Sequence, residues 1–187
     1  MFFVFDISTT PDPELLLSKY GKSGTTALII KEHVDPSEIS VASATNMPIS
    51  YKKIVSWVGL WIENNGSPRQ QISWSGVNEK EGLRKLFDAL KMFKDFGLIH
   101  YNGRTTHLPL ITYRAMKHEL VKPARLSSHD IVYRYSNQNI DLVDTFSNYG
   151  ASPPPEFNDL AHLIDIGGSG SSSRSILSIQ SLTEKKL

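Results

Sequence analysis

Runs of apolar residues separated by turn-forming residues predict four β-strands along the chain. Residues 2–7 are aromatic or β-branched, apart from one aspartate, and end at the turn signals of STTPDP. Residues 52–63 are apolar on both faces of a strand, and the turn NNGSP joins them to a third strand at residues 69–76. Three successive strands with a short turn predict an antiparallel meander. A fourth strand is expected within residues 97–103.

Helical spacing of apolar residues predicts two longer and two shorter helices. The clearest lies within residues 78–97, where Asn78 is the expected N-cap and acidic residues occupy the first turn. The second longer helix, at residues 107–118, tolerates a proline in its first turn. The two shorter helices are expected at residues 139–150 and 157–168.

This order of elements predicts an α/β fold with a mixed sheet, in which a helix connects the three-strand meander to a parallel strand. Residues 18–50 contain glycines and prolines and are expected to form a loop, with one short helix near Asp35. Residues 1–168 are expected to form one folded domain. Residues 169–187 follow a glycine- and serine-rich stretch and are expected to form a Ser-rich flexible tail.

Composition narrows the classes of function. The chain has 187 residues, which suits one α/β domain, and it has no cysteine, which excludes disulfides and Cys-ligated zinc or iron–sulfur sites. The formal net charge of +1 predicts no global attraction to nucleic acid, so any such binding needs a local patch. No segment is long and apolar enough for a signal peptide or a membrane span, so a cytoplasmic protein without a membrane partner is expected. A serine-hydrolase nucleophile motif, Gly-x-Ser-x-Gly, is absent from the sequence.

Several segments, taken in order, resemble one enzyme family. VFDISTTPD at residues 4–12 is similar to the Phe-Asp-x-Glu-Thr motif of the DEDD 3′–5′ exonucleases, and IHYNGRTTHLP at residues 99–109 resembles their Asn-x-x-x-Phe-Asp motif. Residues 51–63, 113–118, 139–151 and 157–166 resemble the subgroup related to the proofreading exonuclease domain of family-B DNA polymerases. The resemblance covers roughly residues 1–168 and implies an RNase H-like fold with flanking helices.

The resemblance also implies a site where four carboxylates hold two divalent ions, Mg²⁺ or Mn²⁺, which activate water for attack on the terminal 3′ phosphodiester. Asp6 matches the first metal ligand. Ser8 stands where the family has glutamate, and His107 stands where it has aspartate, with Thr106 in place of the preceding phenylalanine. The fourth motif, Tyr-x-x-x-Asp, has no counterpart, because no tyrosine follows Tyr149. One family ligand of four is therefore expected to remain.

Other residues are candidates for substitute metal ligands. His107 and Ser8 can supply an imidazole and a hydroxyl beside Asp6, which suits Zn²⁺ or Mn²⁺ better than Mg²⁺. Asp141 and Asp144 are three positions apart on one predicted helix, where first-turn acids also stabilise the helix dipole. His118 lies about 16 Å from His107 along a helix axis, too far to share an ion.

Asn102, Arg104, Tyr113 and Arg114 are the candidate contacts to nucleic acid, because an arginine can bind phosphate and an aromatic ring can stack on a base. A solvated helix face is an equal alternative for these residues. The three tryptophans are expected in the core.

Three functions stay open at this stage. The first is a 3′–5′ exonuclease that acts on single-stranded DNA or RNA ends and retains little or no activity. The second is a pseudo-exonuclease that binds such ends, a protein partner or a second copy of the chain. The third is a truncated, decayed copy, in which a missing C-terminal helix would expose an apolar strip.

Overall fold

A computed structural model describes residues 1–20 and 47–163 of the chain. Most of the loop expected at residues 18–50, including the short helix near Asp35, lies outside these residues, as do the predicted domain boundary at residue 168 and the expected tail. The described ends of that loop are partly helical, since residues 18–20 belong to a helix and residues 49–50 to a 3₁₀ helix.

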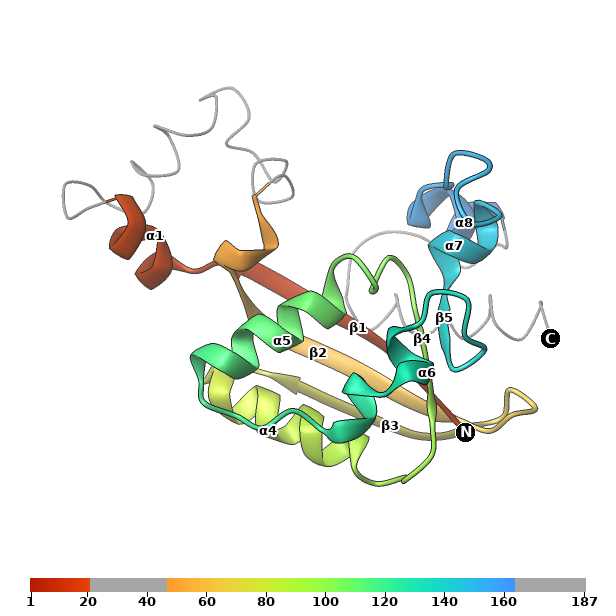
Figure 1. Ribbon diagram of the computed structural model, residues 1–187, viewed down its shortest axis with the longest axis horizontal. Coiled ribbons are helices and arrows are strands. Elements are labelled where there is room, and N and C mark those ends of the chain that lie inside the picture. The colour runs from red at the N-terminus through yellow and green to blue at the C-terminus, as the bar shows by residue number, and fades with distance from the viewer. Residues whose placement is uncertain (21–46, 164–187) are drawn as a thin grey trace.

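A five-stranded mixed sheet forms the centre of the molecule, in the order β3-β2-β1-β4-β5 (Figure 1). The first three strands pair in antiparallel fashion, and β4 and β5 continue the sheet in parallel with β1. This confirms the predicted α/β fold with a meander and a parallel strand. The strands are β1 (Phe2–Pro11), β2 (Lys52–Ile62), β3 (Pro68–Ser75), β4 (Gly97–His100) and β5 (Asn139–Asp141).

The fifth strand departs from the sequence prediction, which placed a helix over residues 139–150. Only three residues form β5, and the helix α7 (Leu142–Phe146) begins directly after it. Asp141 ends the strand and caps the helix, because its side chain accepts a hydrogen bond from the Val143 N–H. A strand of three residues is too short to show an alternating pattern, so the helical spacing that follows it dominated the prediction.

The first strand is also longer than predicted. It continues through the expected turn to Pro11, which pairs with Lys52, and an irregularity between Ser8 and Thr9 interrupts the register. The Asp-Pro pair after the strand begins the unpredicted helix α1 (Pro13–Tyr20). Asp12 accepts hydrogen bonds from the N–H groups of Glu14 and Leu15, as an N-cap followed by proline does.

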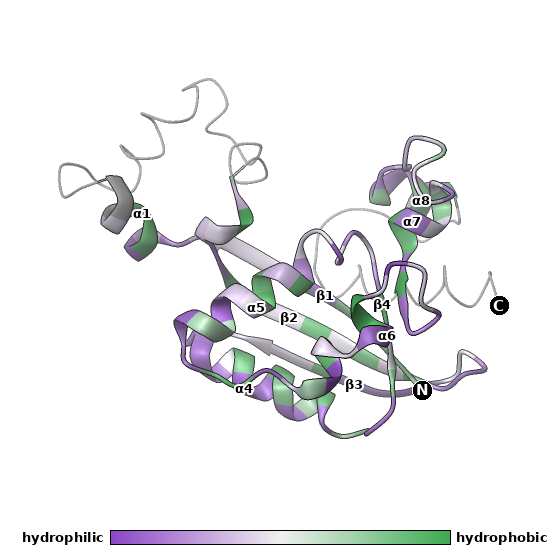
Figure 2. Cartoon of the chain, viewed as in Figure 1, coloured by the Kyte–Doolittle hydropathy of each residue, from purple (hydrophilic) through white to green (hydrophobic). Residues whose placement is uncertain are grey.

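One face of the sheet is covered by α4 (Glu79–Leu90) and α5 (His107–Lys117) (Figure 1). Figure 2 shows the apolar and polar residues interspersed along α4, whose apolar side chains are buried. Asn78 caps α4 as predicted. All three tryptophans lie in the core, as predicted, with Trp74 the most exposed of them at 8%.

The other face carries a second apolar cluster, which includes Val4, Ile99 and Leu142, and Phe146 and Phe157 pack against it. Short helices complete the described fold: the 3₁₀ helices η2 (Ile49–Tyr51) and η3 (Ala124–Ser127), and the α-helices α6 (His129–Val132) and α8 (Phe157–Leu163). Among the described residues, no helix combines the length and apolar character needed to cross a membrane.

Candidate functional site

The candidate site lies where the parallel strands β1 and β4 end. Their pairing stops at Val4 and Ile99, so Asp6 lies beyond the last pair, beside the turn that leads into α5. Crevices at the carboxyl ends of parallel strands are the usual ligand sites of open α/β sheets. Two of the sequence-predicted ligand positions, Asp6 and His107, meet here.

The Nε2 atom of His107 lies 3.3 Å from the Oδ1 atom of Asp6. His107 is buried and packs against the ring of Phe5, and no described residue hydrogen-bonds its Nδ1 atom. Burial, together with the nearby His100, lowers the pKa of His107 to about 3, so the imidazole is neutral near pH 7. Burial also raises the pKa of Asp6, against an opposing hydrogen bond from the Ile7 backbone. The pair therefore carries at most one negative charge.

The donor set does not fit two divalent ions. Ser8 lies on the same face of β1 as Asp6, but its hydroxyl is neutral and a poorer ligand than the glutamate of the family. Within residues 1–20 and 47–163, no group of three or more His, Asp or Glu side chains is arranged to hold a metal ion.

Asp141 holds the turn that precedes α5. Its carboxylate accepts hydrogen bonds from the N–H groups of Asn102 at 2.8 Å, Arg104 at 3.0 Å and Val143 at 3.1 Å. Burial would raise the pKa of Asp141, but His100 and these backbone donors outweigh burial and hold the pKa at about 2. Asp141 is thus a structural anion at this turn, which does not fit a role as a substitute metal ligand.

Asp144 is likewise engaged. It binds the Arg104 guanidinium at 3.2 Å and the Arg134 guanidinium at 2.6 Å. Arg104 also donates to the backbone carbonyl groups of Arg134 and Asn139. Arg104, which the sequence predicts as a phosphate contact, therefore holds the segment before β5 against the turn.

The Asn-Gly part of the motif shapes the turn. Asn102 has a positive φ of 55°, which asparagine tolerates better than most residues. Gly103 lies against the buried His100, and a Cβ atom there would lie 2.5 Å from the ring. The Gly103 N–H donates to His100 Nδ1 at 3.1 Å, and His100 Nε2 is hydrogen-bonded to the Asn139 side chain at 2.7 Å. His100 thus links β4, the turn and β5.

Arg114 is buried inside the fold. It is 2% exposed and forms ion pairs with Asp12 at 2.6 Å and with Glu79, which also accepts hydrogen bonds from the Ile54 N–H and from His118. This buried placement fits neither the expected phosphate contact nor the alternative of a solvated helix face.

Tyr113 is the exposed member of the predicted set. Its side chain is 45% exposed and lines a cavity of about 330 Å³ together with Arg104 and Lys122. Lys117, one turn further along α5, is instead paired with Asp12 and Glu14.

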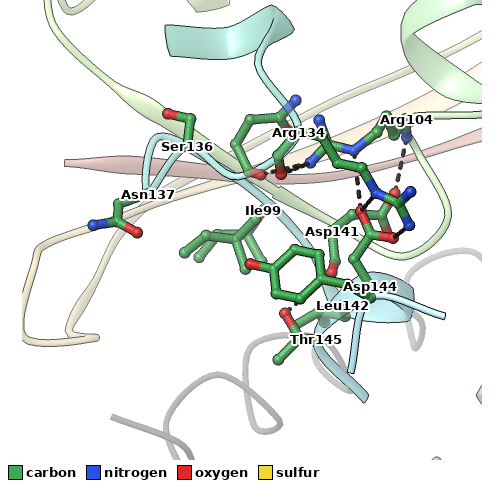
Figure 3. Close-up of a pocket in the computed structure, with 12 residues that line it drawn as sticks. Ile99, Arg104, Arg134, Ser136, Asn137, Asp141, Leu142, Asp144 and Thr145 are labelled. Carbon is green, nitrogen blue, oxygen red and sulfur yellow. Dashed lines mark hydrogen bonds and ion pairs between the residues drawn. The ribbon is translucent and has the colours of Figure 1, made fainter. Parts of the chain in front are cut away.

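The structure contains a second cavity, of about 260 Å³, that the sequence did not predict (Figure 3). It lies between β5, α7 and the segment that precedes β5, and Arg104, Arg134, Asp144 and Tyr149 are among the residues that line it. The sequence signal was the run Tyr133-Arg134-Tyr135, in which two large aromatic residues flank an arginine inside a polar segment.

The profile of a protein family described as predicted 3′–5′ exonucleases related to the exonuclease domain of PolB matches residues 44–173. The chain belongs to this family. The match spans more than half of the 187 residues, and it begins after the strand that carries Asp6 and Ser8. No curated protein sequence matches the chain.

Solved exonuclease structures share the fold. The zinc-bound crystal structure of the E. coli ExoI–ssDNA complex superposes with a TM-score of 0.63 at 9% sequence identity, over 98% of this chain and 39% of that one. Another structure of exonuclease I gives 0.64 at 9% identity, over 98% and 40%. The family B DNA polymerase of Pyrobaculum calidifontis gives 0.57 at 14% identity, over 98% and 24%. The chain thus spans about two fifths of the length of exonuclease I, and the likeness establishes a shared RNase H-like fold.

Proposed function

We propose that this exonuclease-like domain binds the ends of single-stranded nucleic acid and hydrolyses them weakly or not at all. The observation that carries the proposal is the pairing of Asp6 with a buried, neutral His107 at the position of a carboxylate site. The family relationship supports nucleic acid as the ligand. One of the similar structures, that of ExoI, is a complex with single-stranded DNA.

Two divalent cations can be held close together only where negative charge from the protein offsets their repulsion. Two doubly charged ions about 4 Å apart repel by roughly 16 kcal/mol at an effective dielectric constant of about 20. Four carboxylates cancel that charge in the family, whereas Asp6 supplies one, and burial raises its pKa. A neutral imidazole and a hydroxyl add no negative charge. We therefore derive no hydrolytic step through metal ions.

The architecture around the missing ligands supports retained binding. The turn that leads into α5 is fixed by Asp141, which accepts two of its backbone N–H groups, and by the buried His100. Tyr113 is exposed beside a cavity that Arg104 of the turn also lines, and its ring can stack on a base. The binding group proposed for this site is thus the exposed Tyr113, rather than the buried Arg114.

The decisive experiment is degradation of 5′-labelled single-stranded DNA and RNA with Mg²⁺ or Mn²⁺, beside an Asp6→Ala variant as the control. We expect no cleavage above the control on either substrate, and salt-sensitive binding of the same oligonucleotides. A ladder that shortens from the 3′ end, and that EDTA and the substitution both abolish, would overturn the proposal of weak or absent hydrolysis. Absence of oligonucleotide binding would overturn the binding role.

A further inference from the structure

Three tyrosines form an exposed aromatic cluster on the described surface, away from Asp6 in the sequence. Tyr133, Tyr135 and Tyr149 are 48%, 56% and 47% exposed, and the ring centroids of successive members lie 5.7 Å and 5.0 Å apart. The ring of His129 stacks on Tyr133 at 5.2 Å. Contiguous large aromatic side chains that remain half exposed are typical of binding surfaces. We call Tyr133, Tyr135 and Tyr149 the tyrosine cluster.

The tyrosine cluster adjoins the cavity of about 260 Å³, because Tyr149 lines it. The cavity combines an apolar part, formed by Ile99, Ile140 and Leu142, with polar side chains. In Figure 3, Asn137 and Ser136 lie on the side opposite Arg104 and Asp144. Its volume is near the lower end for ligand pockets, which suits one aromatic heterocycle rather than a large ligand.

The backbone at Tyr149 is strained. Asn148, Tyr149 and Gly150 have successive positive φ angles of 51°, 57° and 93°. Glycine adopts this conformation freely and asparagine tolerates it, but a bulky aromatic residue is rarely found there. Strain of this kind persists where the surrounding structure enforces it and often where a side chain has a function. The strained position here is the one that presents its ring to the cavity.

The charges at the cavity are balanced. The Asp144 carboxylate is bound by Arg104 and Arg134, and Asp141 is satisfied by backbone N–H groups. The interior therefore favours an uncharged ligand with polar edges over a free anion. Arg134 uses Nε and Nη2 on Asp144 and remains 47% exposed, so its outer edge can meet a phosphate outside the cavity.

We propose that the cavity and the tyrosine cluster form a base-binding subsite for single-stranded nucleic acid. One base enters the cavity against Tyr149, a neighbouring base stacks on Tyr135, and Arg134 contacts the phosphate between them. Stacking on tyrosine is tolerant of sequence, so the subsite accepts DNA and RNA. This inference rests on the proposed function, because it presumes that the domain binds nucleic acid.

The test is fluorescence anisotropy with labelled oligothymidylate and oligouridylate and the full chain. Tyr149→Gly removes the ring and suits the positive φ, so the loop should keep its conformation. Asn148→Gly is the matched control, because it introduces glycine at the adjacent positive-φ position and keeps the Tyr149 ring. We expect Tyr149→Gly to weaken binding about tenfold, and Asn148→Gly to leave binding within about twofold. Tyr135→Ser, which alters no positive-φ residue, should weaken binding in the same direction.

A parallel measurement separates this inference from the proposed function. Saturation-transfer NMR with thymidine monophosphate detects a base at the subsite independently of oligonucleotide binding. Equal oligonucleotide affinity in the wild type and both tyrosine variants would overturn the subsite and leave the proposed function standing. Nucleotide contact that Tyr149→Gly removes, without oligonucleotide binding, would assign the cavity to a mononucleotide and overturn both the proposed function and the subsite for a single strand. Binding of neither probe would overturn both. A proline-rich peptide that binds the tyrosine cluster when the oligonucleotides do not would assign it to a protein partner and overturn the subsite.

Discussion

At the scale of single residues, the site is defined by what stands beside Asp6. His107 is a neutral, buried imidazole, and Ser8 lies on the same face of β1 as Asp6. An aspartate at position 107 would place a second buried carboxylate next to Asp6, and like charges at that distance repel. A divalent ion would relieve that repulsion. Two substitutions can therefore convert a site that does not suit divalent metal ions into one that responds to them.

We predict that combined Ser8→Glu and His107→Asp substitutions lower the melting temperature in the absence of metal and that Mn²⁺ restores it, since an ion that binds only the folded state stabilises it. Mn²⁺ should bind at least about tenfold more tightly than in the wild type, because affinity for hard cations follows ligand charge. Thermal scans and isothermal titration calorimetry measure both effects. Adding Asp6→Asn to this variant is the control and should remove the Mn²⁺ response. A wild type that binds Mn²⁺ as tightly as the variant would contradict the charge argument.

The sequence predicts the ligand positions of the site but not their surroundings. Ser8 and His107 are visible because a family motif aligns with them. Nothing in the sequence predicted that Asp141 holds the turn or that Arg114 is buried, because both depend on partners 35 or more positions away. The tyrosine cluster was missed for a similar reason, since Tyr149 joins Tyr135 only after α7 has folded back.

At the scale of elements, a buried group of charges holds α1, α4 and α5 together and ties them to β2. Arg114 on α5 pairs with Asp12, the cap of α1, and with Glu79, the first residue of α4. Burial would raise the pKa of both acids. For Asp12, hydrogen bonds from Lys117 and Arg114 outweigh burial and lower the pKa to about 2. For Glu79, hydrogen bonds from Arg114 and His118 outweigh burial and lower the pKa. The sequence predicted Glu79 only as a first-turn acid, because its partner belongs to another helix.

We predict that Arg114→Met lowers the free energy of unfolding by about 3–5 kcal/mol at pH 7, because it leaves two buried acids without their partner. Urea denaturation measures the loss. Lys85→Ala is the matched control, since it breaks an exposed pair with Glu81 and should cost at most about 0.5 kcal/mol. A loss for Arg114→Met as small as that of the control would show that the buried pairs contribute no net stability.

The same variant carries a pH dependence. In the folded chain, the pKa values of Asp12 and Glu79 are lower than in the unfolded chain. Their contribution to the free energy of unfolding is therefore fully present above about pH 4, and it is lost as the pH falls through the folded pKa of Asp12, about 2. The stability difference between wild type and Arg114→Met should therefore shrink between about pH 4 and pH 2. A difference that stays constant across this window would contradict the assignment of the effect to ionised Asp12 and Glu79.

At the scale of the whole molecule, the described residues form two apolar clusters, one on each face of the sheet. The main apolar cluster joins the sheet to α4 and α5, and it contains all three tryptophans. A second cluster joins the opposite face to α7 and α8. A decayed copy would be expected to accumulate unpaired polar groups and cavities in such a core. The described core instead contains few buried side-chain atoms without a hydrogen-bond partner, among them Trp61 Nε1 and His107 Nδ1.

We therefore predict that the chain unfolds in one cooperative transition. Far-ultraviolet circular dichroism reports on the secondary structure, while tryptophan fluorescence reports on the main core, because Trp57, Trp61 and Trp74 all lie there. Two-state unfolding requires that the two probes give the same midpoint in urea and the same dependence on urea concentration. A broad change in fluorescence that precedes the loss of helix signal would indicate a loosely packed core, and would favour a decayed copy over a domain maintained for binding.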